Sequence, residues 1–188
     1  MPRLAERSQL SPEEYLAWER QQERKHEYFE GEVYAMAGGS PRHNRLSSRV
    51  TTALEIALGG RCHVFSSDQR IRSRERRYVY PDVSVACASL VIEQEDVLVN
   101  PTIIVEVLSS TTEQYDRGLT WEAYQLLPSL TDYVLVSQDR ARIEHFARTP
   151  GGRWVYTSAN AGEHLRLTGE TVLDIDKIFA GVFELPGD

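Results

Sequence analysis

The sequence predicts a mixed α/β fold, in which helices pack against a sheet that contains both parallel and antiparallel strands. Residues 102–137 have the pattern of a strand, a helix and a second strand, which is the crossover unit of a partly parallel sheet. Shorter alternating segments before and after this unit predict extra antiparallel hairpin strands. The 188 residues are expected to form one domain over 1–188.

The first third of the chain predicts two helices separated by a hairpin. Residues 11–24 are expected to form a helix with Ser11 as the N-cap, because Pro and Glu follow it at the favoured positions. Residues 26–38 alternate around a turn at Glu30-Gly31, which predicts a β-hairpin. Residues 40–60 begin with Ser-Pro, end in Gly-Gly and carry apolar residues at helical spacing, so they predict the second helix.

The rest of the chain consists of short segments that predict strands, interrupted by two helices. Strands are expected at 62–68, 69–73, 77–87, 102–108 and 131–136, and hairpin strands over 140–172. Helices are expected at 110–127, where Pro128 ends the helix, and at 174–181.

The charge is unevenly distributed along the chain. Residues 1–80 carry 14 Lys and Arg against 11 Asp and Glu, whereas residues 81–188 carry 7 against 17, and the net charge is −7. This total argues against a protein that coats nucleic acid by basic charge alone, but it suits an enzyme that binds phosphates in one part and cations in another. No apolar stretch is long enough to span a membrane and the N-terminus lacks a signal peptide core, so we expect a cytoplasmic protein.

The two cysteines, Cys62 and Cys87, each stand alone in an apolar segment that resembles a strand. We interpret them as small buried hydrophobic residues and not as a disulfide or a metal site, because their spacing matches no metal-binding pattern.

Two carboxylates interrupt strand segments that are otherwise apolar: Asp82 in YPDVSVAC and Glu106 in IIVEVLS. A buried ionised carboxylate is costly unless a partner compensates its charge. If the two strands are neighbours, about 5 Å apart, both carboxylates could bind one divalent cation. The alternative is that each acid caps a strand end or pairs with an arginine.

The segments HEYFEGEVYAMAGGSPRHN, YPDVSVAC and PTIIVEVLSSTTEQYDRG, in this order, resemble a large bacterial family of restriction-endonuclease-like proteins within the PD-(D/E)xK nuclease superfamily. The resemblance extends from about residue 11 to residue 146. It implies a restriction-endonuclease-like core that hydrolyses phosphodiester bonds of nucleic acid, most simply DNA, with Mg²⁺ or Mn²⁺. We also expect a homodimer, because cleaving both strands of a duplex needs two sites related by a two-fold axis.

The resemblance also implies roles for single residues. Asp82 and Glu106 would be metal ligands, with the backbone carbonyl of Val107 as a third. Glu27 resembles the family's N-terminal acid, which reaches the same metal, and His43 resembles its histidine near a helix start, where free backbone N–H groups suit a phosphate. A solvated hairpin acid and a plain helix-start histidine are the alternatives. Contacts to the nucleic-acid backbone are expected from Arg42, Arg45, Arg49, Arg70 and Arg72, unless the last two belong only to a solvated charged turn.

One position departs from the superfamily pattern. The catalytic lysine expected two residues after the second acid is replaced by Leu108, and in this family the lysine looks to have moved to the position of Thr120. Arg117 shares the expected helical face and could supply positive charge, although its pKa is too high for it to accept a proton. Two interpretations follow: a metal-dependent endonuclease with weakened catalysis, or an inactive nuclease-fold protein that binds nucleic acid or regulates.

Overall fold

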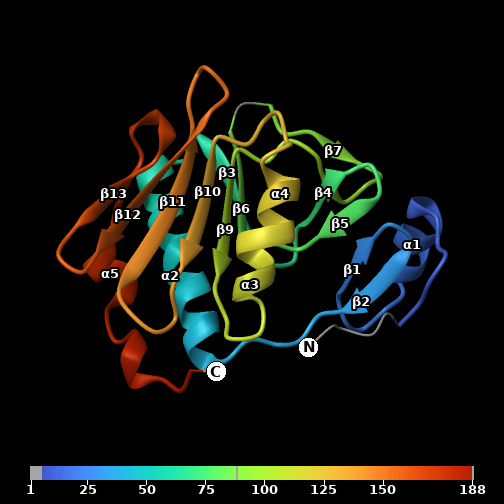
Figure 1. Ribbon diagram of the computed structural model, residues 1–188, viewed down its shortest axis with the longest axis horizontal. Coiled ribbons are helices and arrows are strands. Elements are labelled where there is room, and N and C mark those ends of the chain that lie inside the picture. Colours follow the sequence, from blue (N-terminus) through green and yellow to red (C-terminus); the bar gives the residue numbers. More distant parts are fainter. Residues whose placement is uncertain (1–5, 88, 188) are drawn as a thin grey trace.

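The structure is a computed structural model that describes residues 6–87 and 89–187 (Figure 1). Its centre is a six-stranded mixed sheet, and the expected α/β class is confirmed. In order across the sheet, the strands are β12 (Trp154–Asn160), β11 (Arg142–Arg148), β10 (Asp132–Val136), β9 (Ile103–Val107), β6 (Val83–Cys87) and β3 (Cys62–Ser66).

The expected crossover unit lies in the middle of this sheet. Strands β9 and β10 pair in parallel, with Glu106 opposite Leu135, as the pattern of residues 102–137 predicted. Strands β6 and β9 pair antiparallel, with Val83 opposite Val105. The start of β6 and the end of β9 therefore lie at the same edge of the sheet, which brings Asp82 beside Glu106.

Helices cover both faces of the central sheet (Figure 1). On one face, α2 (Pro41–Leu58) and α5 (Ile175–Phe179) pack against alternate residues of the inner strands, such as Val105 and Val134. On the opposite face lie α3 (Glu113–Tyr115) and α4 (Trp121–Tyr124), where Tyr124 joins the core that contains Ile104 and Tyr133. Because strand residues alternate between faces, Glu106 has the same orientation as Ile104 and lies on the α4 side.

A second six-stranded sheet extends to one side of the central one. Its strands are, in order, β2 (Glu32–Ala35), β1 (His26–Phe29), β5 (Arg77–Val79), β4 (Arg70–Arg74), β8 (Val97–Leu98) and β7 (Ile92–Glu93). The hairpin turn is where the sequence placed it, with φ of +49° at Glu30 and +100° at Gly31. A pair of short strands, β13 (His164–Arg166) and β14 (Val172–Asp174), completes the sheets.

The first helix, α1 (Pro12–Glu19), begins at the predicted N-cap, Ser11, but is shorter than expected. It packs on the β1–β2 hairpin, where Tyr15 stacks on Tyr28 with ring centroids 4.9 Å apart. It ends before residue 24 because residues 21–24 are all polar and offer nothing to bury.

The helix expected over 110–127 is interrupted. A π-helical turn, Asp116–Thr120, separates α3 from α4. Since a π turn is wider than an α turn, side chains across it do not share the faces that a spacing of 3.6 residues predicts. This irregularity decides which side chains of the segment point toward Glu106.

The interpretation of the cysteines is wrong. Cys62 and Cys87 form a disulfide. They lie directly opposite each other in the antiparallel pairing of β3 and β6, a register that no local pattern of either segment reveals. The bond closes a loop with a sequence separation of 25 residues.

We expect the disulfide to contribute to stability by restricting the unfolded chain. Replacing both cysteines by serine should lower the free energy of unfolding by about 2–4 kcal/mol and the Tm by roughly 5–15 °C. Thermal denaturation with and without a thiol reductant measures this effect. The reductant should lower the Tm of the wild type and leave that of the double variant unchanged; equal Tm values for the two proteins under oxidising conditions would contradict the expectation.

Within the described part of the chain, none of the helices combines the length and the apolar character needed to cross a lipid bilayer.

Candidate functional site

Asp82 and Glu106 lie side by side at one edge of the central sheet. Oδ2 of Asp82 accepts a hydrogen bond of 2.7 Å from the backbone N–H of Val107, and Oε2 of Glu106 accepts one of 3.3 Å from the N–H of Asp82. Both side chains line a cavity of about 350 Å³, which we call the acid cavity. The two strand-interrupting acids therefore share one face, as the sequence predicted.

The surroundings of Glu106 disfavour the ionised form of its side chain. Burial raises the pKa of Glu106 well above its usual range, and the nearby carboxylates of Asp116 and Asp82 raise it further. The hydroxyl of Tyr124 donates a hydrogen bond of 2.9 Å to Oε1 and partly offsets these effects. A cation bound among these like charges would be stabilising.

Asp116 is a site residue to which the sequence analysis gave no role. It is nearly buried, lines the acid cavity, and its charge acts on Glu106 more strongly than that of Asp82. It stands in the QYDRG segment of the family resemblance, which is the signal that could have identified it.

Two residues distant in sequence reach the same cavity. His43 lies in the first turn of α2, whose N-cap Ser40 accepts a hydrogen bond of 3.2 Å from the backbone N–H of His43. This places its Nε2 3.2 Å from Oδ2 of Asp82. Glu27, on β1, also lines the acid cavity, and its charge adds to the raised pKa of Glu106. The structure thus brings together Glu27, His43, Asp82, Glu106 and Val107.

Thr120, at the position of the missing lysine, faces the acid cavity and is buried. The guanidinium of Arg77 lies behind it: Nη2 donates to the hydroxyl of Thr120 at 3.3 Å and to that of Tyr115 at 2.9 Å, and Nη1 donates to the carbonyl of Leu119 at 2.9 Å. Sequence analysis placed Arg77 at the start of the strand expected over 77–87 and gave it no role at the site. Its position at the start of the segment RYVYPDV, which was expected to form a strand, was the available signal.

The expectation that Arg117 faces the acids is wrong. Its guanidinium donates two hydrogen bonds, of 2.8 and 2.9 Å, to the carboxylate of Glu144 on β11, and its Nε donates to Glu113 at 2.9 Å. It lines a neighbouring cavity with these two acids and does not line the acid cavity. The π turn accounts for the difference, because it directs Asp116 and Thr120 inward and Arg117 toward β11.

We therefore expect Arg117→Ala to affect stability and not cation binding. The hydrogen bonds from Arg117 lower the pKa of Glu144, so the pair is stabilising above the usual pKa of a glutamate and loses this effect as the pH falls through the lowered value. The variant should lose about 1 kcal/mol at pH 7, a figure kept small because Arg117 is partly exposed. Denaturant titration at pH 7 and pH 3 measures it; a difference of equal size at both pH values would contradict this account.

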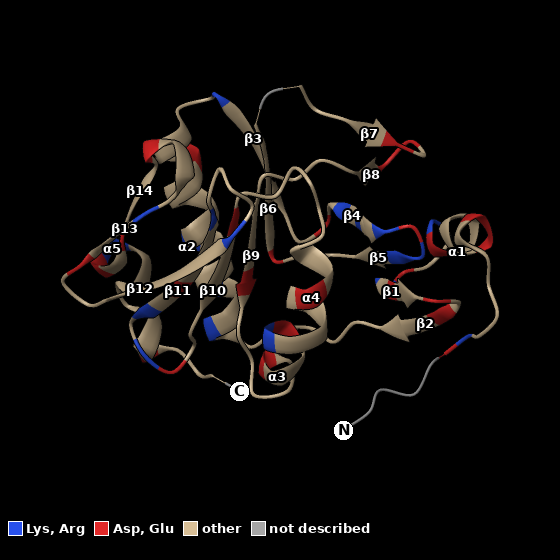
Figure 2. Ribbon diagram, turned by 45° about the horizontal axis from the view of Figure 1, so that its top comes forward, with Lys and Arg blue, Asp and Glu red and all other residues tan. Residues whose placement is uncertain are grey.

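The arginines expected to bind nucleic acid have different surroundings. Arg70 is buried, with Nε 2.8 Å from the hydroxyl of Tyr80, so the expectation that it contacts a ligand backbone is wrong. Arg72 pairs with Glu93 at 2.8 Å. Both residues lie on β4, and Figure 2 shows basic segments on this strand and on the neighbouring β5.

The other three arginines, Arg42, Arg45 and Arg49, lie on α2, the helix that carries His43. Arg42 is bound to the C-terminal segment, because its Nη2 donates to the carbonyl of Leu185 at 2.9 Å. Its Nη1 donates to the carbonyl of Gln138 at 3.2 Å. Arg49 donates to the carbonyl of Ala180 at 3.3 Å. Arg45 is exposed, and a contact between it and a nucleic-acid backbone stays a prediction.

A family model and two individual proteins resemble this chain. Residues 12–181 match the model of the Uma2 family, described as "Putative restriction endonuclease". Uncharacterized protein slr1290 of Synechocystis sp. is 39% identical over 176 residues, which covers 92% of this chain and 93% of the relative. Uncharacterized protein sll1609 of the same organism is 33% identical over 152 residues, covering 79% and 86%.

A solved structure has a similar fold. It is the crystal structure of "a putative nuclease belonging to DUF820" from Anabaena variabilis, with a TM-score of 0.76 and 15% sequence identity. The superposition covers 92% of this chain and 99% of the other. At this identity the likeness shows the fold alone.

Proposed function

This chain belongs to the Uma2 family of restriction-endonuclease-like proteins, and we propose that it hydrolyses phosphodiester bonds of nucleic acid, most simply DNA, with Mg²⁺ or Mn²⁺ held by Asp82 and Glu106. The observation that supports this most strongly is the pair of carboxylates side by side in one cavity. Ionisation of both carboxylates is unfavourable without a cation, since burial, Asp116 and Asp82 all raise the pKa of Glu106.

The donor set fits a weakly held magnesium ion. No group of three or more His, Cys, Asp or Glu side chains in residues 6–87 and 89–187 is arranged to hold a metal. Mg²⁺ in phosphoryl-transfer sites usually takes only one or two carboxylates, and its other ligands are water and substrate phosphate. Asp82 and Glu106 would supply these carboxylates, the carbonyl of Val107 is available as a further ligand, and Glu27 lies in the same cavity.

The residues around Asp82 and Glu106 would have separate roles in hydrolysis. A bound cation would polarise the scissile phosphate and lower the pKa of a water molecule. His43, whose Nε2 lies 3.2 Å from Oδ2 of Asp82, would orient that carboxylate, and Tyr124 would orient Glu106. Arg77, behind Thr120, would supply the positive charge that the superfamily's lysine supplies, since a fixed guanidinium stabilises charge that develops on phosphate oxygens.

Calorimetric titration of the protein with Mg²⁺ and with Mn²⁺ tests the cation site without any nucleic acid. Incubation with single-stranded and duplex DNA and RNA, with each cation or with EDTA, then tests hydrolysis. We expect saturable cation binding and cleavage that EDTA abolishes. Absence of cation binding would overturn the proposal.

The second candidate is a nuclease-fold protein that binds nucleic acid without cleaving it. Thr120 at the lysine position favours it, because threonine carries no positive charge. Saturable cation binding together with nucleic-acid binding, but without cleavage of any of these substrates, would select this function.

A two-fold homodimer stays a prediction that applies to duplex cleavage. Light scattering at concentrations used for cleavage measures the mass directly. A monomeric mass together with cleavage of both strands would contradict it.

A further inference from the structure

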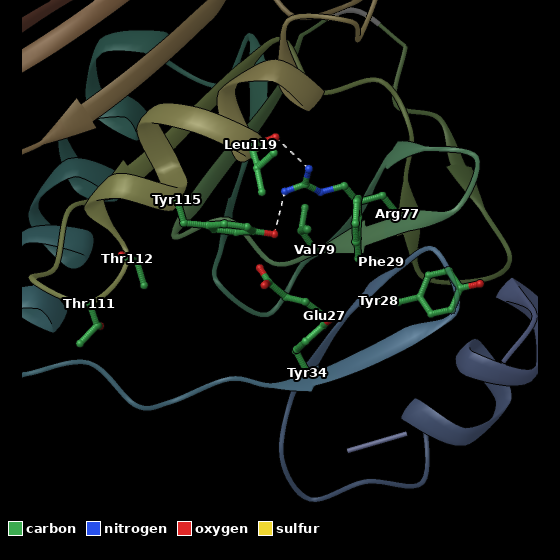
Figure 3. A pocket seen from close by; sticks show the side chains of 10 residues that line it. All are labelled: Glu27, Tyr28, Phe29, Tyr34, Arg77, Val79, Thr111, Thr112, Tyr115 and Leu119. Atoms are coloured by element: carbon green, nitrogen blue, oxygen red, sulfur yellow. Dashed lines mark hydrogen bonds between the residues drawn. The ribbon is translucent and has the colours of Figure 1, made fainter. Parts of the chain in front are cut away.

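A second cavity adjoins the acid cavity. It has a volume of about 330 Å³, within the range of sites that bind small organic groups. We call it the aromatic cavity, and its main lining residues are Glu27, Phe29, Tyr34, Arg77, Tyr115 and Leu119 (Figure 3). Glu27 and Tyr115 line both cavities, so a group bound in one would lie next to a group bound in the other.

Large apolar side chains are exposed around this cavity. Phe29 is 36% exposed, Tyr115 37% and Leu119 55%, although all three come from regular elements that could have buried them. They belong to separate parts of the chain, β1 and the segment around the π turn, which converge here (Figure 3). Exposed apolar side chains that gather around one cavity mark a binding site more often than scattered ones do.

Arg77 forms the buried wall between the two aromatic rings. Its side chain is almost fully buried, and its Cζ lies 5.3 Å from the ring centre of Phe29 and 5.5 Å from that of Tyr115. Its Nε is a buried donor without a hydrogen-bond partner among the described residues. A buried donor of this kind is costly unless a ligand satisfies it.

We propose that the aromatic cavity binds an unpaired nucleobase of the substrate while the neighbouring phosphate lies at the acids. This inference rests on the proposed function. Phe29 and Tyr115 offer ring faces on which a base can stack, and every base has such a face. A phosphate is the less suitable occupant, because the carboxylate of Glu27 lines the cavity and because the Nη atoms of Arg77 already bind Tyr115, Thr120 and Leu119.

A base bound in the aromatic cavity would restrict the class of substrate. A base in an intact duplex has its faces covered by its neighbours, so it can enter only after extrusion, which costs free energy. The preferred substrate is then a single strand, or a duplex with an unpaired position. Because the cavity would hold one base, removal of a base should weaken binding at a single position relative to the bound phosphate.

The experiment measures binding of fluorescent 12-nucleotide single strands by anisotropy, with Ca²⁺ in place of Mg²⁺ and with a gel that verifies intact DNA. The strands differ only in the place of one abasic site. In the wild type, we expect one abasic position to weaken binding about tenfold, as for loss of one base–aromatic stack. In Phe29→Ala, affinity for the intact strand should fall by a similar factor, and that abasic position should have no further effect.

Matched variants separate stacking from general effects. Tyr156→Ala removes a half-exposed aromatic side chain on β12, at the far edge of the central sheet, and should leave binding unchanged. Phe29→Leu keeps an apolar side chain if the alanine variant does not fold, and it should also lose the abasic effect. Wild-type affinity in Phe29→Leu, or an abasic effect that is independent of residue 29, would overturn the proposal. The cation titration contains no nucleic acid, so failure of the proposed cation site is detected separately.

Discussion

Glu106→Gln is expected to abolish divalent-cation binding and to reduce cleavage by more than the roughly 10–100-fold typical when an outer partner of a metal site is lost. The substitution removes one of two carboxylates that would hold the cation. It preserves the shape of the side chain, since the amide oxygen can still accept from the N–H of Asp82 and the amide nitrogen can donate to Tyr124. Calorimetric titration and cleavage assays measure both effects.

The same variant should be more stable than the wild type without metal at neutral pH. Burial, Asp116 and Asp82 raise the pKa of Glu106, so the folded protein holds this proton more tightly than the unfolded chain does. Folding is therefore not penalised below the unfolded pKa of a glutamate, about 4.3, and the penalty grows as the pH rises through the raised folded pKa. At pH 7 the Tm of Glu106→Gln should rise by about 2–4 °C for each kcal/mol of penalty removed.

An exposed glutamate on the neighbouring helix provides the control. Glu122→Gln changes the net charge equally, and should alter neither cation binding nor the pH profile of the Tm. A Glu106→Gln protein that binds Mg²⁺ like the wild type would refute the site. A Tm advantage that persists at pH 4 would show that the added stability has another cause.

Arg77→Met is expected to reduce kcat by about tenfold or more, because it removes the positive charge behind Thr120, and each ~1.4 kcal/mol of lost transition-state stabilisation is a factor of ten in rate. Cation binding should persist, because Arg77 contacts neither Asp82 nor Glu106 in the described hydrogen bonds. The free energy of unfolding should fall by about 1–3 kcal/mol, because the carbonyl of Leu119 loses its buried donor. Steady-state kinetics, cation titration and denaturant unfolding measure the three effects.

A second substitution tests whether Arg77 replaces the missing lysine. In the Arg77→Met protein, Thr120→Lys should restore part of the lost kcat, because it places an ammonium group where the arginine had acted. In the wild type, Thr120→Lys should be destabilising, since the new cation would lie against the guanidinium, whose Nη2 is 3.3 Å from the threonine hydroxyl. Arg76→Met, on an arginine paired with Glu30, is the matched control and should not alter kcat. Unchanged kcat in Arg77→Met would refute the assignment.

Local patterns determined most of the fold and the centre of the site. Ser11 and Ser40 cap helices because their side chains accept hydrogen bonds from backbone N–H groups. This chemistry is visible in a few consecutive residues. Glu30-Gly31 forms its turn for similarly local reasons. Asp82 and Glu106 could be identified because a charge within an apolar strand is costly wherever that strand lies. Family resemblance added Glu27 and His43, which the structure brings to the same cavity.

Only the tertiary structure decided which partners these segments meet. The sequence contained both Arg117 and Arg77, but the π turn directs one toward Glu144, and the pairing of β5 places the other behind Thr120. The disulfide depends on the register of β3 against β6, and the burial of Arg70 depends on Tyr80 and Asp96. Hydrophobic periodicity indicates which face of one element is buried, whereas these contacts depend on how separate elements pack together, so no local pattern contains them.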